Sequence, residues 1–178
     1  TINNDDAAVV HLTLLDATKN EGTGGTTDFT FKATLDNPVQ DGFDLAFTVT
    51  DGTATDADDY DVITTSPLSF TGTANEMQII TVRVLADAKV EADETFSVSI
   101  EDTGFSSTTA PAGTLTTAST VVATIQNDDA ATLSIDDVTM VEGISGATTF
   151  TFTVTLNAEV QGGLVVNYTT QNGTASTA

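Results

Sequence analysis

The chain has 178 residues and a net charge of −22, because 26 acidic residues face only four basic ones. This balance excludes nucleic acid and anionic membrane surfaces as partners, since both require a basic surface on the protein. The hydrophobic content of 39%, with nine Phe, is sufficient for a packed core, and the absence of Cys excludes a disulfide framework.

No apolar run in the sequence approaches the roughly 20 residues that a bilayer-spanning helix needs. We therefore expect no direct membrane insertion. No signal peptide is recognisable, and the chain begins at Thr1 rather than Met. These features indicate a piece of a longer protein.

Three short motifs recur in the same order along the chain. TINNDD at 1–6 returns as TIQNDD at 124–129, EG at 21–22 returns at 142–143, and DGTA at 51–54 returns as NGTA at 172–175. Such a period indicates tandem repeats. We expect the tail of a preceding repeat at 1–6, a complete repeat at 7–129 and the first part of a further repeat at 130–178. The last part holds only three expected strands, so it cannot close a sandwich alone.

Alternating runs rich in Val, Ile, Thr and Phe predict seven strands in the complete repeat. In chain order they cover residues 8–18, 27–36, 43–50, 61–70, 77–86, 95–102 and 118–126. No segment has convincing helical periodicity. Seven short strands separated by turns predict an all-β fold of tandem immunoglobulin-like, Greek-key β-sandwiches.

The alternation within these strands also predicts which side chains face the core. The expected inward residues are Phe29, Phe31, Ala33, Leu35, Leu45, Phe47, Val49, Phe96, Val98, Ile100, Val121, Ala123 and Ile125. The alternation in 77–86 is too poor to assign its inward face. His11 is expected to be structural or on the surface. Gly52 and Gly173 are expected in turns with positive φ.

Acidic residues are concentrated in every second connection between the expected strands. They are Glu21 after the first strand, Asp56, Asp58 and Asp59 after the third, Asp87, Glu91, Asp93 and Glu94 after the fifth, and Asp128 and Asp129 after the seventh. If consecutive strands alternate in direction, all four groups lie at the same end of the sandwich. The stretch 87–96, DAKVEADETF, carries the largest of them.

Clustered carboxylates repel one another unless water or a cation compensates their charge. Ca²⁺ takes six to eight oxygen ligands from flexible loops, whereas Mg²⁺ usually keeps several waters. The absence of Cys and the single His disfavour zinc or copper. No D-x-D-x-D-G loop is present, so the sequence predicts a Ca²⁺ site assembled from separate loops rather than an EF-hand. A merely solvated acidic surface is the alternative.

The motifs of the complete repeat resemble the Calx-β family. They are Glu21-Gly22, Gly52-Thr53-Ala54 with Asp59-Tyr60, Leu68-Ser69-Phe70, the acidic stretch from Asp87 to Phe96, and Ile125-Gln126-Asn127-Asp128-Asp129. The third repeat has only the opening motifs. The resemblance implies an immunoglobulin-like sandwich that binds Ca²⁺ in its end loops.

The ligands implied by the resemblance are Glu21, Asp59, Asp87, Glu91, Asp128 and Asp129, with Glu94 as a second-line candidate. Two departures imply fewer ions or weaker binding. Ala86 and Ala88 flank Asp87, and Asn127 stands where a third terminal Asp is possible. Because no membrane segment is present, the role of this family in sodium/calcium exchangers does not transfer. The Thr-rich, Cys-free tandem copies resemble the bacterial form found in large cell-surface proteins and adhesins.

Asp128 and Asp129 end one repeat just before the next begins, which places the expected ion at an inter-domain junction. We therefore expect a calcium-stiffened spacer in an extracellular filament, with neighbouring repeats of the same chain as its partners. Two alternatives remain open. One is an adhesive module that binds a glycan or cell-surface ligand through its Thr-rich faces or the connection 103–117. The other is an accessory domain of a secreted enzyme.

Catalysis within this segment is not expected. The sequence has no G-x-S-x-G or metalloprotease motif, and paired carboxylates without an aromatic platform (no Trp, two Tyr) disfavour a glycosidase.

Overall fold

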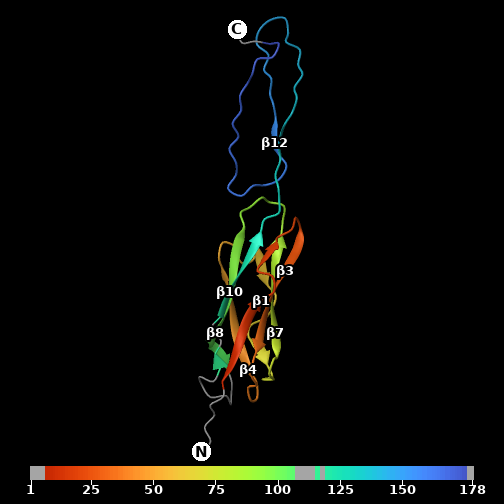
Figure 1. The fold of residues 1–178 in the computed structure, drawn as a ribbon. Helices are drawn as coiled ribbons and strands as arrows, with labels where there is room; N and C mark the ends of the chain where they lie inside the picture. Colours follow the sequence, from red (N-terminus) through yellow and green to blue (C-terminus); the bar gives the residue numbers. More distant parts are fainter. Residues whose placement is uncertain (1–6, 107–114, 117–118, 176–178) are drawn as a thin grey trace, which may run out of the picture.

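The computed structural model describes residues 7–106, 115–116 and 119–175. The complete repeat forms a sandwich of two five-stranded sheets, and the following residues extend from one end of it as a narrow third unit (Figure 1). No helix occurs in the described part of the chain. The predicted all-β, immunoglobulin-like fold class is therefore confirmed. The expected tail of a preceding repeat, 1–6, lies outside the described residues.

Six of the eight strand pairs in the two sheets are antiparallel. The first has the order β5 (Tyr60–Val62), β7 (Met77–Ala86), β3 (Gly25–Leu35), β1 (Ala8–Leu14) and β9 (Leu115–Thr116). The second has the order β2 (Thr18–Asn20), β10 (Ser119–Gln126), β8 (Glu94–Ser106), β4 (Phe43–Asp51) and β6 (Leu68–Phe70). The pairs β1–β9 and β2–β10 are parallel.

Two expected strands were wrong as single elements. The segment 8–18 divides into β1 and β2, which lie in opposite sheets, and 61–70 divides into β5 and β6 in the same way. In the second case Pro67 precedes β6, and proline has no amide hydrogen with which to continue a ladder. The alternation of side chains could not reveal the crossings, because both sheets bury every second residue against one core.

The predicted core is confirmed almost completely. Phe29, Phe31, Leu45, Phe96 and the other expected residues are buried, except that Val49 and Val121 are only partly buried against the core. The structure also resolves β7, whose buried residues are Ile80, Val82 and Val84. The Phe96 ring lies at the centre, with its centroid 4.8 Å from that of Tyr60, 5.4 Å from Phe29 and 6.1 Å from Phe31.

Gly52 is required for a different reason from the one predicted. Its φ is not positive, so the expected turn conformation was wrong. A Cβ atom at this position would lie 2.4 Å from the carbonyl oxygen of Thr95. Glycine therefore allows the end of β4 to approach the start of β8, where Ala54 N–H donates to the Thr95 carbonyl at 3.0 Å. Gly173 has neither a positive φ nor a heavy atom within 4 Å of a built Cβ.

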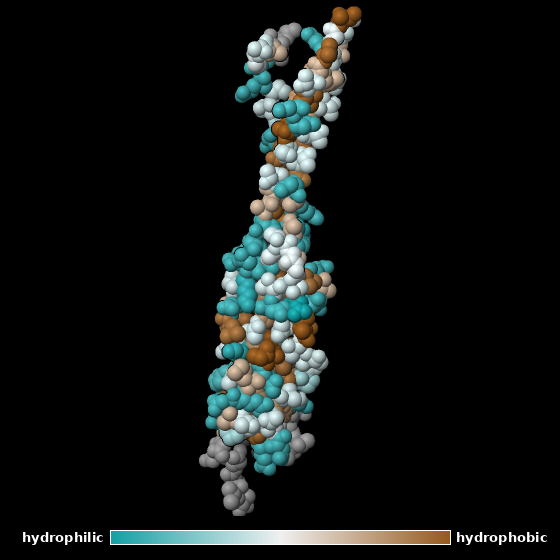
Figure 2. All heavy atoms as spheres, turned by 90° about the vertical axis from the view of Figure 1, so that its right-hand side faces the viewer, coloured by the Kyte–Doolittle hydropathy of each residue, from teal (hydrophilic) through white to brown (hydrophobic). Residues whose placement is uncertain are grey.

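The third unit does not form a sandwich in the described residues. Strand β11 (Leu133–Ile135) pairs with β12 (Val154–Leu156), and no strand follows up to residue 175. Phe150 and Phe152 remain 46% and 54% exposed. Hydrophobic side chains accordingly lie on the surface of the narrow upper part in Figure 2. The expected third strand of this unit does not form in the described residues up to 175.

Candidate metal centre

The four acidic connections meet at the end of the sandwich from which the third unit emerges. Six of the seven candidate ligands form two clusters, Glu21–Asp87–Asp129 and Asp59–Glu91–Glu94. In each cluster, one carboxylate oxygen from each residue lies within 4.8 Å of the others. These residues come from the β2–β3, β4–β5 and β7–β8 connections, from the first residue of β8 and from the chain after β10. The antiparallel strand order therefore assembles both clusters from distant parts of the sequence.

The first cluster contains the most buried carboxylate, that of Glu21, beside a half-buried Asp129 and an exposed Asp87. Glu21 is only 7% exposed, and the backbone of Asp87 lies beside its carboxylate. Asp129 Oδ2 is buried and has no hydrogen-bond partner among the described residues. A buried, unpartnered carboxylate oxygen is costly unless a donor or cation satisfies it.

The charges of the first cluster oppose ionisation of Glu21. Burial, followed by the charges of Asp87 and Glu91, raises the pKa of Glu21 from 4.5 to about 7. Burial and the neighbouring Asp128 likewise raise the pKa of Asp129. A carboxylate whose pKa is raised in this way favours binding of a proton or of another cation.

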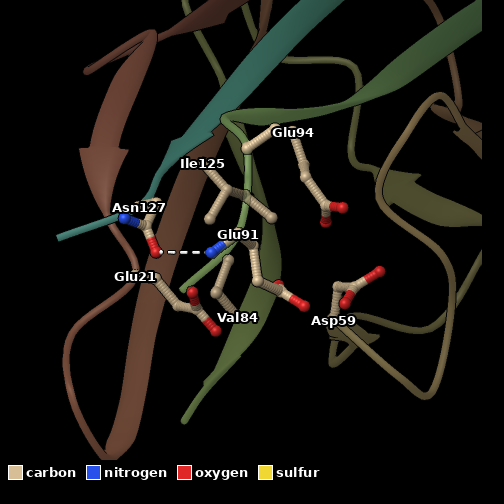
Figure 3. Close-up of a pocket in the computed structure, with 8 residues that line it drawn as sticks. Glu21, Asp59, Val84, Glu91, Glu94, Ile125 and Asn127 are labelled. Atoms are coloured by element: carbon tan, nitrogen blue, oxygen red, sulfur yellow. Dashed lines mark hydrogen bonds between the residues drawn. The ribbon is translucent and has the colours of Figure 1, made fainter. Parts of the chain in front are cut away.

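The second cluster is half-buried beside the first. Asp59 Oδ2 accepts hydrogen bonds from the amide and hydroxyl of Thr55, at 2.7 and 3.0 Å. The Lys89 ammonium pairs with Glu91. Burial and the charges of Asp59 and Glu91 raise the pKa of Glu94. Figure 3 shows the Asp59, Glu91 and Glu94 carboxylates pointing toward a common space, with Glu21 on the other side of Glu91.

Asp128 does not join either cluster. Its Oδ1 accepts a hydrogen bond from Gly22 N–H at 2.9 Å, and its Oδ2 accepts one from Asn20 Nδ2 at 3.1 Å. Both oxygens therefore hold the β2–β3 connection in place. Asp56 and Asp58, which share the β4–β5 connection with Asp59, are exposed and belong to neither cluster.

Asn127 connects the loops that carry the two clusters, a role that the sequence analysis missed. Its Oδ1 accepts from Glu91 N–H at 3.0 Å, its Nδ2 donates to the Asp129 carbonyl at 3.1 Å, and its own N–H donates to Asp93 Oδ1 at 3.2 Å. The sequence signal was its position in the recurring TIQNDD motif, where it was interpreted only as a lost carboxylate. An amide supplies both a donor and an acceptor, which a carboxylate cannot.

The donor set fits Ca²⁺. Each cluster offers three carboxylates from separate loops, without a His or Cys, and Ca²⁺ accepts such oxygen ligands in flexible geometry. The unpartnered Asp129 oxygen and the raised pKa of Glu21 show that positive charge is lacking at this end.

Without Ca²⁺, Glu21 is expected to make the chain less stable as the pH rises from about 5 to about 7.5. Its folded-state pKa of about 7 exceeds its ordinary value of 4.5. The folded chain therefore binds more protons than the unfolded chain between these values, and stability decreases with rising pH. Urea unfolding in chelator at pH 5.5 and pH 7.5 measures this change.

The variant Glu21→Gln separates the effect of Glu21 from general charge repulsion. It should unfold at a higher urea concentration than the unchanged chain at pH 7.5 and show a smaller loss between the two pH values. An equal pH dependence in both proteins would contradict the prediction.

The sequence matches the family model described as the Calx-beta domain at residues 3–129 and again at 126–178. A crystal structure of the apo-form Calx CBD1 domain superposes with a TM-score of 0.50 at 18% identity, covering 70% of this chain and all of that one. The structure of CBD12 from CALX1.2 has a TM-score of 0.49 at 20% identity, covering 66% of this chain and 45% of that one. No curated protein matches the sequence.

The family match covers nearly the whole chain, and the CBD1 likeness supports the same β-sandwich fold. The two clusters supply the oxygen ligands that Ca²⁺ requires. The chain therefore belongs to the Calx-beta domain family, and the cofactor that this membership and its acidic clusters indicate is Ca²⁺.

Proposed function

We propose that the complete repeat, 7–129, is a calcium-binding spacer of a large extracellular cell-surface protein of the adhesin type. Its Ca²⁺ end stiffens the junction with the next repeat, which begins near residue 130. The supporting observation is that carboxylates from four connections gather where the chain leaves the sandwich. The recurring sequence motifs favour neighbouring repeats of the same chain as its partners.

Each cluster residue has a defined part in this proposal. Glu21, Asp87 and Asp129 hold one ion, and Asp59, Glu91 and Glu94 hold a second or share the first. Asp128 stays a candidate ligand at the edge of the first cluster, although both its oxygens already accept hydrogen bonds. Bound Ca²⁺ supplies the positive charge that offsets the repulsion among these carboxylates.

The position of Asp129 couples binding to the junction. Only a few residues separate it from Leu133, where β11 of the next unit begins. Asn127 ties the same segment to the β7–β8 loop through Glu91 N–H. Fixing Asp129 against Glu21 and Asp87 therefore restricts the direction in which the chain leaves the sandwich.

The location and the exclusion of catalysis belong to the same proposal. In the described part of the chain no helix is long and apolar enough to cross a membrane. The alternative of an adhesive module rests on the Thr-rich faces or on the connection 103–117, of which 107–114 and 117 lie outside the described residues. The accessory-domain alternative depends on sequence outside this chain. The proposed role is structural and needs no catalytic residue.

Spin labels across the junction test the proposal. The chain has no Cys, so cysteines introduced at the exposed residues Thr48 and Thr155 are unique labelling sites. The distribution of label-to-label distances, measured by electron double resonance, should be narrower in Ca²⁺ than in chelator. Equal widths in both conditions would contradict a calcium-stiffened junction, even if Ca²⁺ binds.

A further inference from the structure

The turn after β12 contacts the β7–β8 loop of the complete repeat through its backbone. Val90 N–H donates to the Glu159 carbonyl at 2.9 Å, and Gln161 N–H donates to the Val90 carbonyl at 2.9 Å. Together these bonds make a parallel bridge between Val90 and Val160. The next unit is thus attached to the complete repeat at a second place, far in sequence from the chain connection at residue 130.

Side chains of the same turn reach the acidic end. The Gln161 side chain lies near the Glu94 carboxylate, a member of the second cluster. Glu159 lies close enough to Lys89 for a favourable charge interaction. The contact therefore combines two backbone bonds with complementary polar groups on both sides.

The complete repeat presents the same turn at its opposite end. Val39-Gln40-Asp41-Gly42 occupies the place between β3 and β4 that Val160-Gln161-Gly162-Gly163 occupies after β12. Gly42 N–H donates to the Val39 carbonyl at 3.4 Å, as Gly163 N–H donates to the Val160 carbonyl at 3.0 Å.

The backbone angles agree as well. The third residue of the turn has φ of 60° in one copy and 74° in the other, and the fourth has 70° and 73°. Pro38 replaces Glu159, but proline keeps the carbonyl group that the bridge uses.

We propose that this Val-Gln turn is a docking element, and that its partner is the β7–β8 loop of the preceding repeat. Val160–Gln161 binds the Val90 loop in this way. Val39–Gln40 is the corresponding turn of the complete repeat. Because successive repeats then join through unlike surfaces, the contact propagates along a row of repeats. The mechanical role of this docking contact rests on the proposed stiff junction, but its two backbone hydrogen bonds form without an ion.

Amide hydrogen exchange in chelator tests the docking contact on the whole chain. The amides of Val90 and Gln161 should exchange at least about tenfold more slowly than unbonded loop amides. The variant Gln161→Pro removes one donor of the bridge and should speed exchange at Val90 about fivefold to tenfold. Gln161→Ala keeps that donor and should leave Val90 protected, whereas the Glu94 contact is lost.

The matched control is Gln40→Pro, the same change in the equivalent turn at the far end of the complete repeat. It should leave exchange at Val90 unchanged. Unprotected Val90 and Gln161 amides in the unaltered chain would overturn the docking contact, as would unchanged Val90 protection in Gln161→Pro. If these amides are protected but Ca²⁺ does not narrow the label distances, the docking contact is supported and the stiffening function is rejected. If Ca²⁺ narrows the distances but the amides are unprotected, the stiffening function is supported and the docking contact is rejected.

Discussion

Calcium is expected to raise the melting temperature of the chain by about 10 °C at a free concentration roughly a hundredfold above its dissociation constant. A ligand that binds only the folded state stabilises it by about 2.7 kcal/mol under these conditions. For a domain of this size, each kcal/mol shifts the melting temperature by about 4 °C. The unfolded chain cannot gather Glu21, Asp87 and Asp129, which lie in three separate connections. Thermal unfolding with Ca²⁺ and with chelator measures the shift.

The double variant Asp87→Asn with Glu91→Gln should abolish this shift and the heat of Ca²⁺ binding in calorimetry. It removes one carboxylate from each cluster. The control Asp56→Asn with Asp58→Asn makes the same change in net charge at exposed positions outside the clusters, and should keep most of the shift. An equal loss in both variants would show that Ca²⁺ acts on the general acidic surface. If Ca²⁺ did not shift the melting temperature of the unaltered chain, the acidic end would be only a solvated surface.

Phe96→Ala is expected to lower the free energy of unfolding by about 4 kcal/mol, the largest loss from a single substitution that we predict. Replacing a buried Phe by Ala typically costs about 3–5 kcal/mol, because it combines lost burial with a cavity. Phe96 is only 1% exposed, and its ring contacts those of Tyr60, Phe29 and Phe31 from the opposite sheet. The substitution would therefore leave a cavity between the two sheets at the centre of the core. Urea unfolding gives the change.

Val122→Ala is the matched control, since Val122 lies on β10 but is 56% exposed. It should change stability by no more than about 0.5 kcal/mol. If the two variants differed by less than about 1 kcal/mol, the centre of the sandwich would not lie at Phe96. If the slope of the unfolding free energy against urea concentration decreased in Phe96→Ala alone, the substitution would have changed the compactness of the folded or the unfolded state.

The sequence predicted the convergence of the acidic connections but not their division into two clusters. Convergence follows from alternating strand direction, because counting the strands tells at which end of the sandwich each connection lies. The division depends on how far each loop reaches: Glu91 and Glu94 lie beside Asp59, whereas Asp87, in the same loop, lies beside Glu21. Loop conformation is set by hydrogen bonds such as Asn127 Oδ1 to Glu91 N–H, which join residues 36 positions apart. No local pattern indicates such a bond.

Asp128 illustrates the same limit. Its charge and motif position are those of Asp129, yet its two oxygens accept bonds from Gly22 and Asn20 while Asp129 Oδ2 remains unpartnered. Two adjacent carboxylates in an extended segment point in different directions, so one anchors a loop and the other faces the cluster. Only the tertiary surroundings give these two adjacent aspartates different roles.

By itself, the sequence determined the all-β class, the buried faces of β3 and β8 and the end of the sandwich where acid accumulates. Each of these depends on a period-two pattern, which is local in the sequence, or on strand order, which follows from counting the strands. Only the tertiary structure decided the crossing of β1–β2 and β5–β6 between sheets, the need for Gly52 beside Thr95, and the contact of Val90 with Val160. These features arise where segments distant in sequence meet, and the chemistry of one segment does not specify which other segment will lie against it.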